Sequence, residues 1–170
     1  MQNTQLFSSI HNLTEAYRTI LSTIDDAQFQ LTPSIGSWSY SEVYSHIFDS
    51  SILSVQAMEN CLEGQGKKHS TAFIVKVILF LGSLPPGRKY KVPKKLEARV
   101  KKITKMEAEE LIRRFIQQLE PDYKRMGKAR SDIKVPHPRL GYLNARQWLR
   151  FIEIHLKHHL KQLKRIENSF

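Results

Sequence analysis

The sequence has a single cysteine, Cys61, and few residues that interrupt regular structure. One cysteine cannot form an internal disulfide, so a disulfide-stapled secreted scaffold is excluded and a reducing compartment is favoured. Only seven glycines and seven prolines occur among 170 residues, a scarcity that favours long helices joined by a few loops. Hydrophobic residues make up 41% and charged residues 25%. This balance is ordinary for a globular chain, and we expect one domain over residues 1–170.

No apolar run in the sequence is long enough to cross a bilayer. The longest, from Ala72 to Leu81, is interrupted by Lys76 and falls short of the ~20 residues that a spanning helix needs. The first five residues, Met1 to Gln5, lack the basic and apolar regions of a secretory signal. We therefore expect a cytoplasmic protein with no membrane partner.

Acidic residues are scarce beside basic ones. The 27 lysines and arginines against 16 acids give a net charge of +11, and nine of these cations lie between Arg88 and Lys105 with one acid, Glu97. Such a run is typical of a solvated surface, and a strongly basic chain can also bind nucleic acid, an anionic membrane surface or acidic small molecules. Nucleic-acid binding through residues 88–105 is disfavoured, because Tyr90 is the only aromatic residue there and stacking platforms need several.

Four long segments have the apolar spacing of amphipathic helices, and three of them begin with a capping-box pattern. The capping pairs are Ser39 with Glu42, Thr104 with Glu107, and Asn144 with Gln147. In the third segment we expect Met106 on the apolar side and an end or kink at Pro121. The apolar piece from Thr71 to Leu81 predicts a short buried helix. With no evident strand pattern, we expect an all-α four-helix bundle with an extra short helix between the second and third long helices.

Two of the seven histidines, His155 and His159, are spaced to share one face of the last helix. Residues four apart lie ~40° apart around the helix axis and one turn apart along it. Both fall on the apolar row that carries Trp148 and Phe151, so we expect them to point into the bundle. His46 falls on the apolar row of the second helix in the same way.

Imidazoles at positions i and i+4 can bind one metal ion, and a third from a facing helix completes a three-ligand site. Three protein ligands leave one or more coordination positions open, as in catalytic sites. The H-x-x-x-H spacing alone is a weak signal, since one inward histidine is more often a hydrogen-bonded core residue. The sequence is also not the metalloprotease motif H-E-x-x-H, because Leu156 occupies the glutamate position. No catalytic residue is assigned.

The segment from His137 to Gln162 contains an H-P-x-x-G-x-L loop, a W-L-x-F step and an H-x-x-H-H-x-x-Q ending. This segment resembles the last loop and helix of the DinB/YfiT-like superfamily, and His46 stands where that superfamily has a histidine in its second helix. The resemblance implies a four-helix bundle with a divalent metal ion bound by His46, His155 and His159. Zinc and nickel are the metals we expect first, although imidazole ligands also suit copper and iron.

Four other polar residues are candidates for supporting contacts around these ligands. Asp49 follows His46 by one turn, and Gln162 follows His159 by three residues, so either could accept an imidazole N–H. The alternative for both is a simple polar surface position. His158 would lie about 100° from His159, as a supporting or helix-interface residue. His137, between two prolines, would lie at the mouth of the pocket or cap the last helix.

Two classes of function remain open from the sequence. Characterised members of the superfamily include thiol S-transferases that use bacillithiol, mycothiol or glutathione, and a maleylpyruvate isomerase. The resemblance therefore implies a metal-dependent enzyme that activates a low-molecular-weight thiol or water for transfer to, or hydrolysis of, a small electrophilic substrate. The alternative is a non-enzymatic metal-binding or stress-associated interaction module, with a homodimer as one form.

Overall fold

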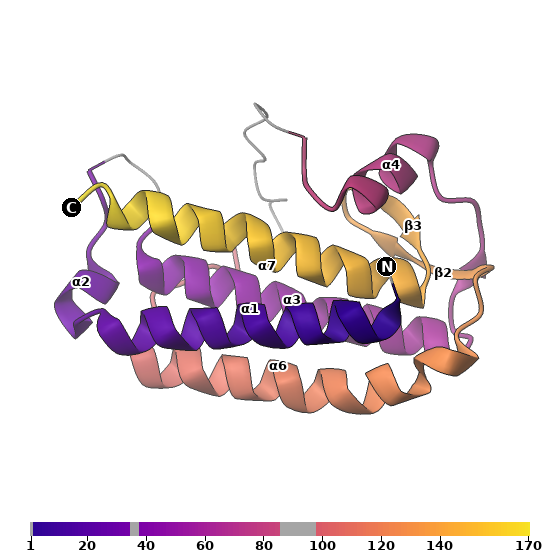
Figure 1. Cartoon of the computed structure of the whole chain (residues 1–170), viewed down its shortest axis with the longest axis horizontal. Coiled ribbons are helices and arrows are strands. Elements are labelled where there is room, and N and C mark those ends of the chain that lie inside the picture. Colours follow the sequence, from indigo (N-terminus) through magenta and orange to yellow (C-terminus); the bar gives the residue numbers. More distant parts are fainter. Residues whose placement is uncertain (1, 35–37, 86–97) are drawn as a thin grey trace.

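Four long helices form the body of the protein and run side by side (Figure 1). This computed structural model describes residues 2–34, 38–85 and 98–170. The long helices are α1 (Asn3–Thr23), α3 (Tyr40–Leu62), α6 (Lys105–Arg125) and α7 (Ala145–Glu167). Helix α3 packs against both α6 and α7, and α1 packs against α7 and α6. The predicted all-α four-helix bundle is thereby confirmed.

The expected capping boxes start three of these helices. Ser39, Thr104 and Asn144 each accept a hydrogen bond from the backbone N–H three residues later, and the side chain at that later position accepts from the cap's own N–H. These contacts satisfy amide groups that have no partner inside the helix. The sequence therefore determines where α3 and α7 begin. These starting points in turn determine the position of each histidine along the bundle axis.

Tyrosine hydroxyls tie the central helices together inside the core. The Tyr17 hydroxyl donates to the Leu156 carbonyl at 2.8 Å, and the Tyr44 hydroxyl donates to the Tyr17 carbonyl at 2.7 Å. Both rings are fully buried and meet edge to face at 5.5 Å between centroids. Because each buried hydroxyl has a partner, the rings contribute apolar burial without an unsatisfied polar group. These contacts fix α1, α3 and α7 relative to one another.

A small antiparallel sheet, absent from our prediction, lies at one end of the bundle. Its strands are β1 (Lys67–Lys68), β2 (Ile133–His137) and β3 (Gly141–Leu143), in the order β1-β2-β3. Val135 pairs with Leu143 and His137 pairs with Gly141. Strands of two to five residues are too short to display an alternating pattern, and β1 pairs with a strand far away in the sequence. The sheet matters for function because β2 carries His137.

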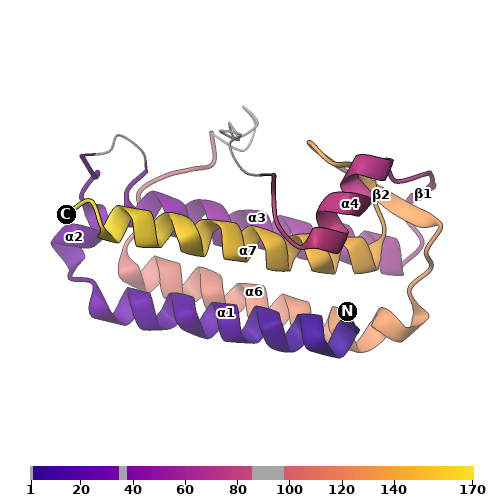
Figure 2. The same ribbon diagram turned by 45° about the horizontal axis from the view of Figure 1, so that its top comes forward.

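The short helix α4 (Phe73–Leu81) is present between α3 and α6, but it is not the buried helix we expected. Only Val75 and Leu79 are buried, whereas Phe73 and Phe80 are 80% and 87% exposed. Helix α4 packs on α7 on the side of the bundle away from α6 (Figure 2). Its apolar composition identified a helix but could not show that one of its faces lacks a partner.

Helix α6 differs from expectation in two places. Met106 is 80% exposed rather than part of the apolar side, and the helix continues through Pro121 to Arg125. The remaining short elements are α2 (Asp26–Gln30) and the 3₁₀ turn η1 (Met126–Lys128).

Residues 86–97, which hold much of the basic run between Arg88 and Lys105, lie outside the described part of the chain. Two described lysines of this run donate hydrogen bonds to the bundle itself. Lys102 donates to the Gln30 carbonyl at 2.7 Å, and Lys105 donates to the Ile24 carbonyl at 2.5 Å. Among the described residues, no helix is both long and apolar enough to cross a membrane.

Candidate metal centre

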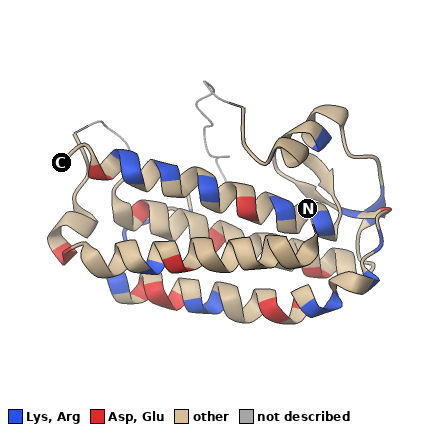
Figure 3. Ribbon diagram, in the orientation of Figure 1, with Lys and Arg blue, Asp and Glu red and all other residues tan. Residues whose placement is uncertain are grey.

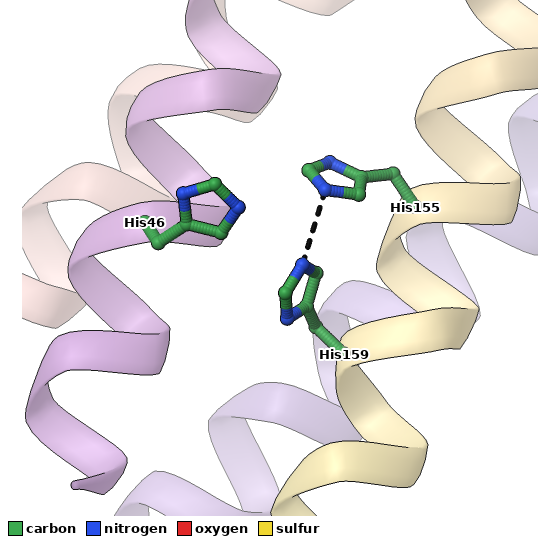
Figure 4. A group of neighbouring side chains, drawn as sticks. All are labelled: His46, His155 and His159. Atoms are coloured by element: carbon green, nitrogen blue, oxygen red, sulfur yellow. Dashed lines mark hydrogen bonds between the residues drawn. The ribbon is translucent and has the colours of Figure 1, made fainter. Parts of the chain in front are cut away.

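Three histidines from two helices converge between α3 and α7 (Figure 4). His46 lies opposite His155 and His159, and a ligand nitrogen from each ring lies within 4.8 Å of the other two. The two α7 rings are closest, with 3.1 Å between their Nε2 atoms. The expected convergence is confirmed, and helical spacing accounts for it, because positions four apart face the same way.

Burial keeps the three imidazoles neutral at ordinary pH. His46 and His159 are 7% and 6% exposed, whereas His155 is partly exposed. Burial lowers the pKa of His46 to about 4. The pKa values of His155 and His159 fall well below the ordinary 6.5, first because of burial and then because of the neighbouring histidines. Neutral imidazole is the form that binds a metal ion, since its unprotonated nitrogen supplies the lone pair.

Gln162 determines which nitrogen of His159 faces the cluster. The Gln162 Oε1 atom lies 2.7 Å from His159 Nδ1, and an amide oxygen can only accept a hydrogen bond. The proton of His159 is therefore on Nδ1, and the lone pair is on Nε2, which points toward His155. The contact expected from the three-residue spacing is present.

The buried Nδ1 atom of His155 has no hydrogen-bond partner within the described part of the chain. The Nε2 atoms of His155 and His159 face each other. Without a metal ion, one of these two nitrogens has to carry a proton, because two lone pairs that face each other repel. Two nitrogens that each lie ~2.0–2.1 Å from one ion are roughly 2.9–3.4 Å apart at octahedral or tetrahedral angles. The 3.1 Å separation lies in this range. The three residues therefore suit a divalent metal ion.

Aromatic rings form the wall of the cluster on the α7 side. Phe151 stacks on His155 with 5.2 Å between ring centroids, and His137 packs on Phe151 at 4.4 Å and on Trp148 at 5.2 Å. The His137 Nδ1 atom accepts backbone N–H bonds from Arg139 and Leu140 at 3.1 and 3.0 Å. His137 therefore does not cap α7. It closes the β2–β3 turn and covers the aromatic wall.

Two further rings contact the cluster directly. Trp38 packs against His46 with 4.9 Å between centroids, and His158 meets the face of His159 edge-on at 5.0 Å. Burial lowers the pKa of His158, and the nearby Arg165 and Lys161 lower it further. His158 thus neighbours a cluster histidine, but it does not belong to the converging group.

Asp49 makes a different contact from the one we expected. Both of its carboxylate oxygens accept hydrogen bonds from Arg99, at 2.6 and 2.7 Å, and it forms no hydrogen bond with a cluster histidine among the described residues. No local pattern predicts Arg99 as the partner of Asp49, since the two residues are 50 positions apart. Asp49 still raises the pKa of His46 through space, against the larger effect of burial.

Comparison with known proteins agrees with this architecture. The fold is a four-helix bundle with a histidine cluster between α3 and α7. The sequence profile of the family described as "Protein of unknown function (DUF1569)" matches residues 2–166, and the chain belongs to that family. Among curated proteins, none matches the sequence.

Two solved structures share the fold. One is described as TT2238, a four-helix bundle protein; it is 17% identical with a TM-score of 0.61, over 96% of this chain and 99% of that chain. The other is a histidine-to-alanine variant of mycothiol-dependent maleylpyruvate isomerase, 12% identical with a TM-score of 0.62, over 94% of this chain. The matched region is 60% of the isomerase, so this chain spans less than two thirds of that enzyme's length.

Proposed function

We propose that this protein is a metal-dependent enzyme that activates a low-molecular-weight thiol, or water, for attack on a small electrophilic substrate. The observation that carries the proposal is the convergence of His46, His155 and His159 on one point between two helices. Zinc or nickel is the ion we expect there. A divalent ion with open coordination positions lowers the pKa of a thiol or water, so that a nucleophile is available at neutral pH.

The protein's own residues have separate roles in this proposal. His46, His155 and His159 hold the ion, and Gln162 keeps the Nε2 lone pair of His159 directed at it. His155 is partly exposed, whereas His46 and His159 are buried, so we expect a substrate to reach the ion past His155. The Phe151 ring stacked on His155 excludes water from one flank of the site.

Two observations favour a thiol over water. The isomerase that shares the fold is, by its description, mycothiol-dependent. Among the residues that the structure describes, the cluster also consists of histidines alone, without a carboxylate that could take a proton from water. A thiol loses its proton without a general base more readily than water does, because its ordinary pKa is about 8.5 and metal coordination removes its proton outright.

The direct test is an assay of thiol transfer. Purified protein loaded with zinc or nickel is mixed with a model electrophile such as 1-chloro-2,4-dinitrobenzene and with bacillithiol, mycothiol or glutathione in turn. We expect metal-dependent product formation with at least one thiol. His155→Ala should lower this rate by roughly 100-fold or more, as expected when a group central to transition-state stabilisation is removed.

His69→Ala is the matched control, because His69 is an exposed histidine on a loop outside the cluster. It should retain the wild-type rate. Equal rates for wild type and His155→Ala with every thiol would contradict the proposal.

The second candidate is a metal-binding module without catalysis. The cluster contains no carboxylate from the described ranges that could act as a general acid or base, and this favours a module without catalysis. In that case the protein binds one metal ion through the same three residues but shows no metal-dependent turnover with any thiol or with water as nucleophile. Metal binding and thiol transfer, measured on the same preparation, distinguish the two candidates.

A further inference from the structure

Helix α4 presents a continuous apolar stripe to solvent. Phe73, Ile74, Phe80 and Leu81 are 80%, 61%, 87% and 66% exposed. Together with Val77 they occupy helical positions i, i+1, i+4, i+7 and i+8, which lie on one face. Isolated exposed apolar side chains are common, but a whole helix face of large ones marks an interaction surface.

The structure holds this face rigidly outward. On the inner side of α4, Val75 and Leu79 pack into the core. Ahead of the helix, the Thr71 hydroxyl donates to the Tyr142 carbonyl at 2.9 Å. At its end, the Arg150 Nε donates to the Leu79 carbonyl at 2.9 Å, where a cation also suits the helix dipole. The stripe is therefore an anchored surface that cannot turn inward without breaking these contacts.

Arg150 also explains the glycine that ends the helix. Gly82 has a φ of +70°, and a Cβ atom there would overlap the Arg150 guanidinium. The guanidinium forms an ion pair with the fully buried Glu153, so it has little freedom to move aside.

Three lysines lie on α4 or near it. Lys76 lies on α4 itself, three residues after Phe73 and four before Phe80, so it neighbours both on the helix surface. Lys67 and Lys134 are directly opposite each other in the β1–β2 pair, with side chains on the same face of the sheet, and Lys134 is 8% exposed. Burial of Lys134 lowers its pKa, nearby Lys76 lowers it further, and Asp132 raises it.

Like charges placed directly opposite one another destabilise a sheet unless an anion compensates them. None of these three lysines forms an ion pair in the described part of the chain. The nearby acid Asp132 is held by Arg130 at 2.8 Å. In Figure 3, α4 is blue at one place and carries no red.

We propose that α4 and the exposed lysines Lys67 and Lys76 form a docking surface for an anionic lipid bilayer. The four exposed apolar side chains enter the boundary between headgroups and acyl chains, as in helices that lie in the plane of a membrane. Lys67 and Lys76 contact anionic headgroups. Our expectation of no membrane partner came from the length needed to span a bilayer, and a helix on the surface needs no such length.

Charge favours a lipid surface over a second copy of the chain. Two copies joined through α4 would bring both sets of lysines together, in a chain whose net charge is +11. The headgroups of an anionic bilayer attract the lysines instead, and the bilayer also buries the apolar stripe. A polyanion such as DNA would satisfy the lysines but leave the stripe in water.

The test is co-sedimentation of the full chain with phosphatidylcholine vesicles that contain or lack 30% phosphatidylglycerol. We expect binding to the anionic vesicles and weaker binding to the neutral ones. Phe80→Ser should lower the partition constant roughly 10-fold or more, because a phenyl ring no longer leaves water. Met106→Ser is the matched control, since Met106 is equally apolar and 80% exposed but lies on α6; it should have no effect.

Lys76→Glu tests the electrostatic part. It should lower binding to anionic vesicles roughly 10-fold, since each cation near the surface contributes about fivefold and the substitution reverses the charge. Lys124→Glu, an exposed change on α6, should leave binding unchanged. Circular dichroism of each variant establishes that it is folded.

Three results would overturn the proposal. The first is an absence of vesicle binding, or equal binding to neutral and anionic vesicles. The second is a dimer in sedimentation velocity that Phe80→Ser dissociates, without vesicle binding, which assigns the stripe to a second copy. The third is retention on DNA that depends on Lys76 but not on Phe80, which assigns the lysines to a polyanion.

Discussion

Gln162 orients His159 within the histidine cluster through a single hydrogen bond. Its Oε1 atom lies 2.7 Å from His159 Nδ1, so it sets both the ring orientation and the tautomer. A ring that is free to turn binds a metal ion less well, because the metal has to restrict that motion on binding. Groups that orient ligand histidines in this way affect metal affinity without touching the ion.

Gln162→Ala should therefore weaken zinc binding about 10- to 100-fold while the protein remains folded. Competition between the protein and a chromophoric chelator measures the affinity. Gln162→Glu keeps an oxygen acceptor at the same place and should retain most of the affinity. A Gln162→Ala variant with unchanged affinity would show that the contact does not orient His159.

The cluster could be predicted from the sequence only in part. His155 and His159 lie on one helix, where a spacing of four determines their common direction, and the resemblance of motifs supplied His46 as their partner. The position of Trp38 just before the second helix indicated a core or pocket-wall residue, and it packs on His46. Arg99 was not predicted as a neighbour. Its contact with Asp49 joins a residue before α6 to α3, and no periodicity within a helix encodes it.

Helix α6 carries a buried carboxylate that costs stability. Asp122 is 4% exposed, and burial, aided by Glu59, raises its pKa from 3.8 to about 6. Above pH 6 the folded protein holds an ionised carboxylate in an unfavourable place, whereas in the unfolded chain the same group is ionised in water. The penalty decreases as the pH falls through 6, and it is absent below 3.8, where both states are protonated.

Asp122→Asn should raise the free energy of unfolding by about 1–2 kcal/mol at pH 8, less than the full shift implies because the ion pair with Arg125 is lost. The gain should disappear near pH 4. Urea unfolding at both values measures it, and Asp132→Asn, a surface change, should show no such pH-dependent gain. Destabilisation at pH 8 would mean that the Arg125 pair outweighs burial.

The helices could be predicted because the residues that determine their ends and their buried faces lie close together in the sequence. Capping pairs such as Ser39 with Glu42 define where a helix begins, and a period of 3.6 residues defines the buried side. The three strands and the exposure of α4 were not predictable in the same way. Strands of two to five residues carry no pattern, and the apolar composition of Phe73–Leu81 does not say what covers it.

At the scale of the whole molecule, the bundle separates an internal histidine cluster from an exposed apolar surface. The histidine cluster lies between α3 and α7, where tyrosine hydroxyl contacts hold α1, α3 and α7 together. The exposed stripe of α4 faces away from this core and is anchored to α7 through Arg150. A substitution in the α4 stripe should therefore leave metal binding by the histidine cluster intact, and the reverse holds too, since sites without shared contacts behave additively.

A metal ion bound only by the folded state should stabilise the whole bundle. At a free concentration 1,000 times the dissociation constant, the stabilisation is about 4 kcal/mol, which raises the melting temperature of a chain of this size by roughly 10 °C. The effect depends on all three ligands, because they come from two helices that unfolding separates.

The most direct test of the central claim is a zinc titration by isothermal calorimetry, made on metal-free wild-type protein and on His46→Ala, His155→Ala and His159→Ala. We expect one ion per chain in the wild type, a loss of at least roughly 100-fold in affinity in each variant, and no loss in His69→Ala. Wild-type protein that binds no zinc or nickel, or variants that all bind as the wild type does, would contradict the assignment of these three histidines as a metal site.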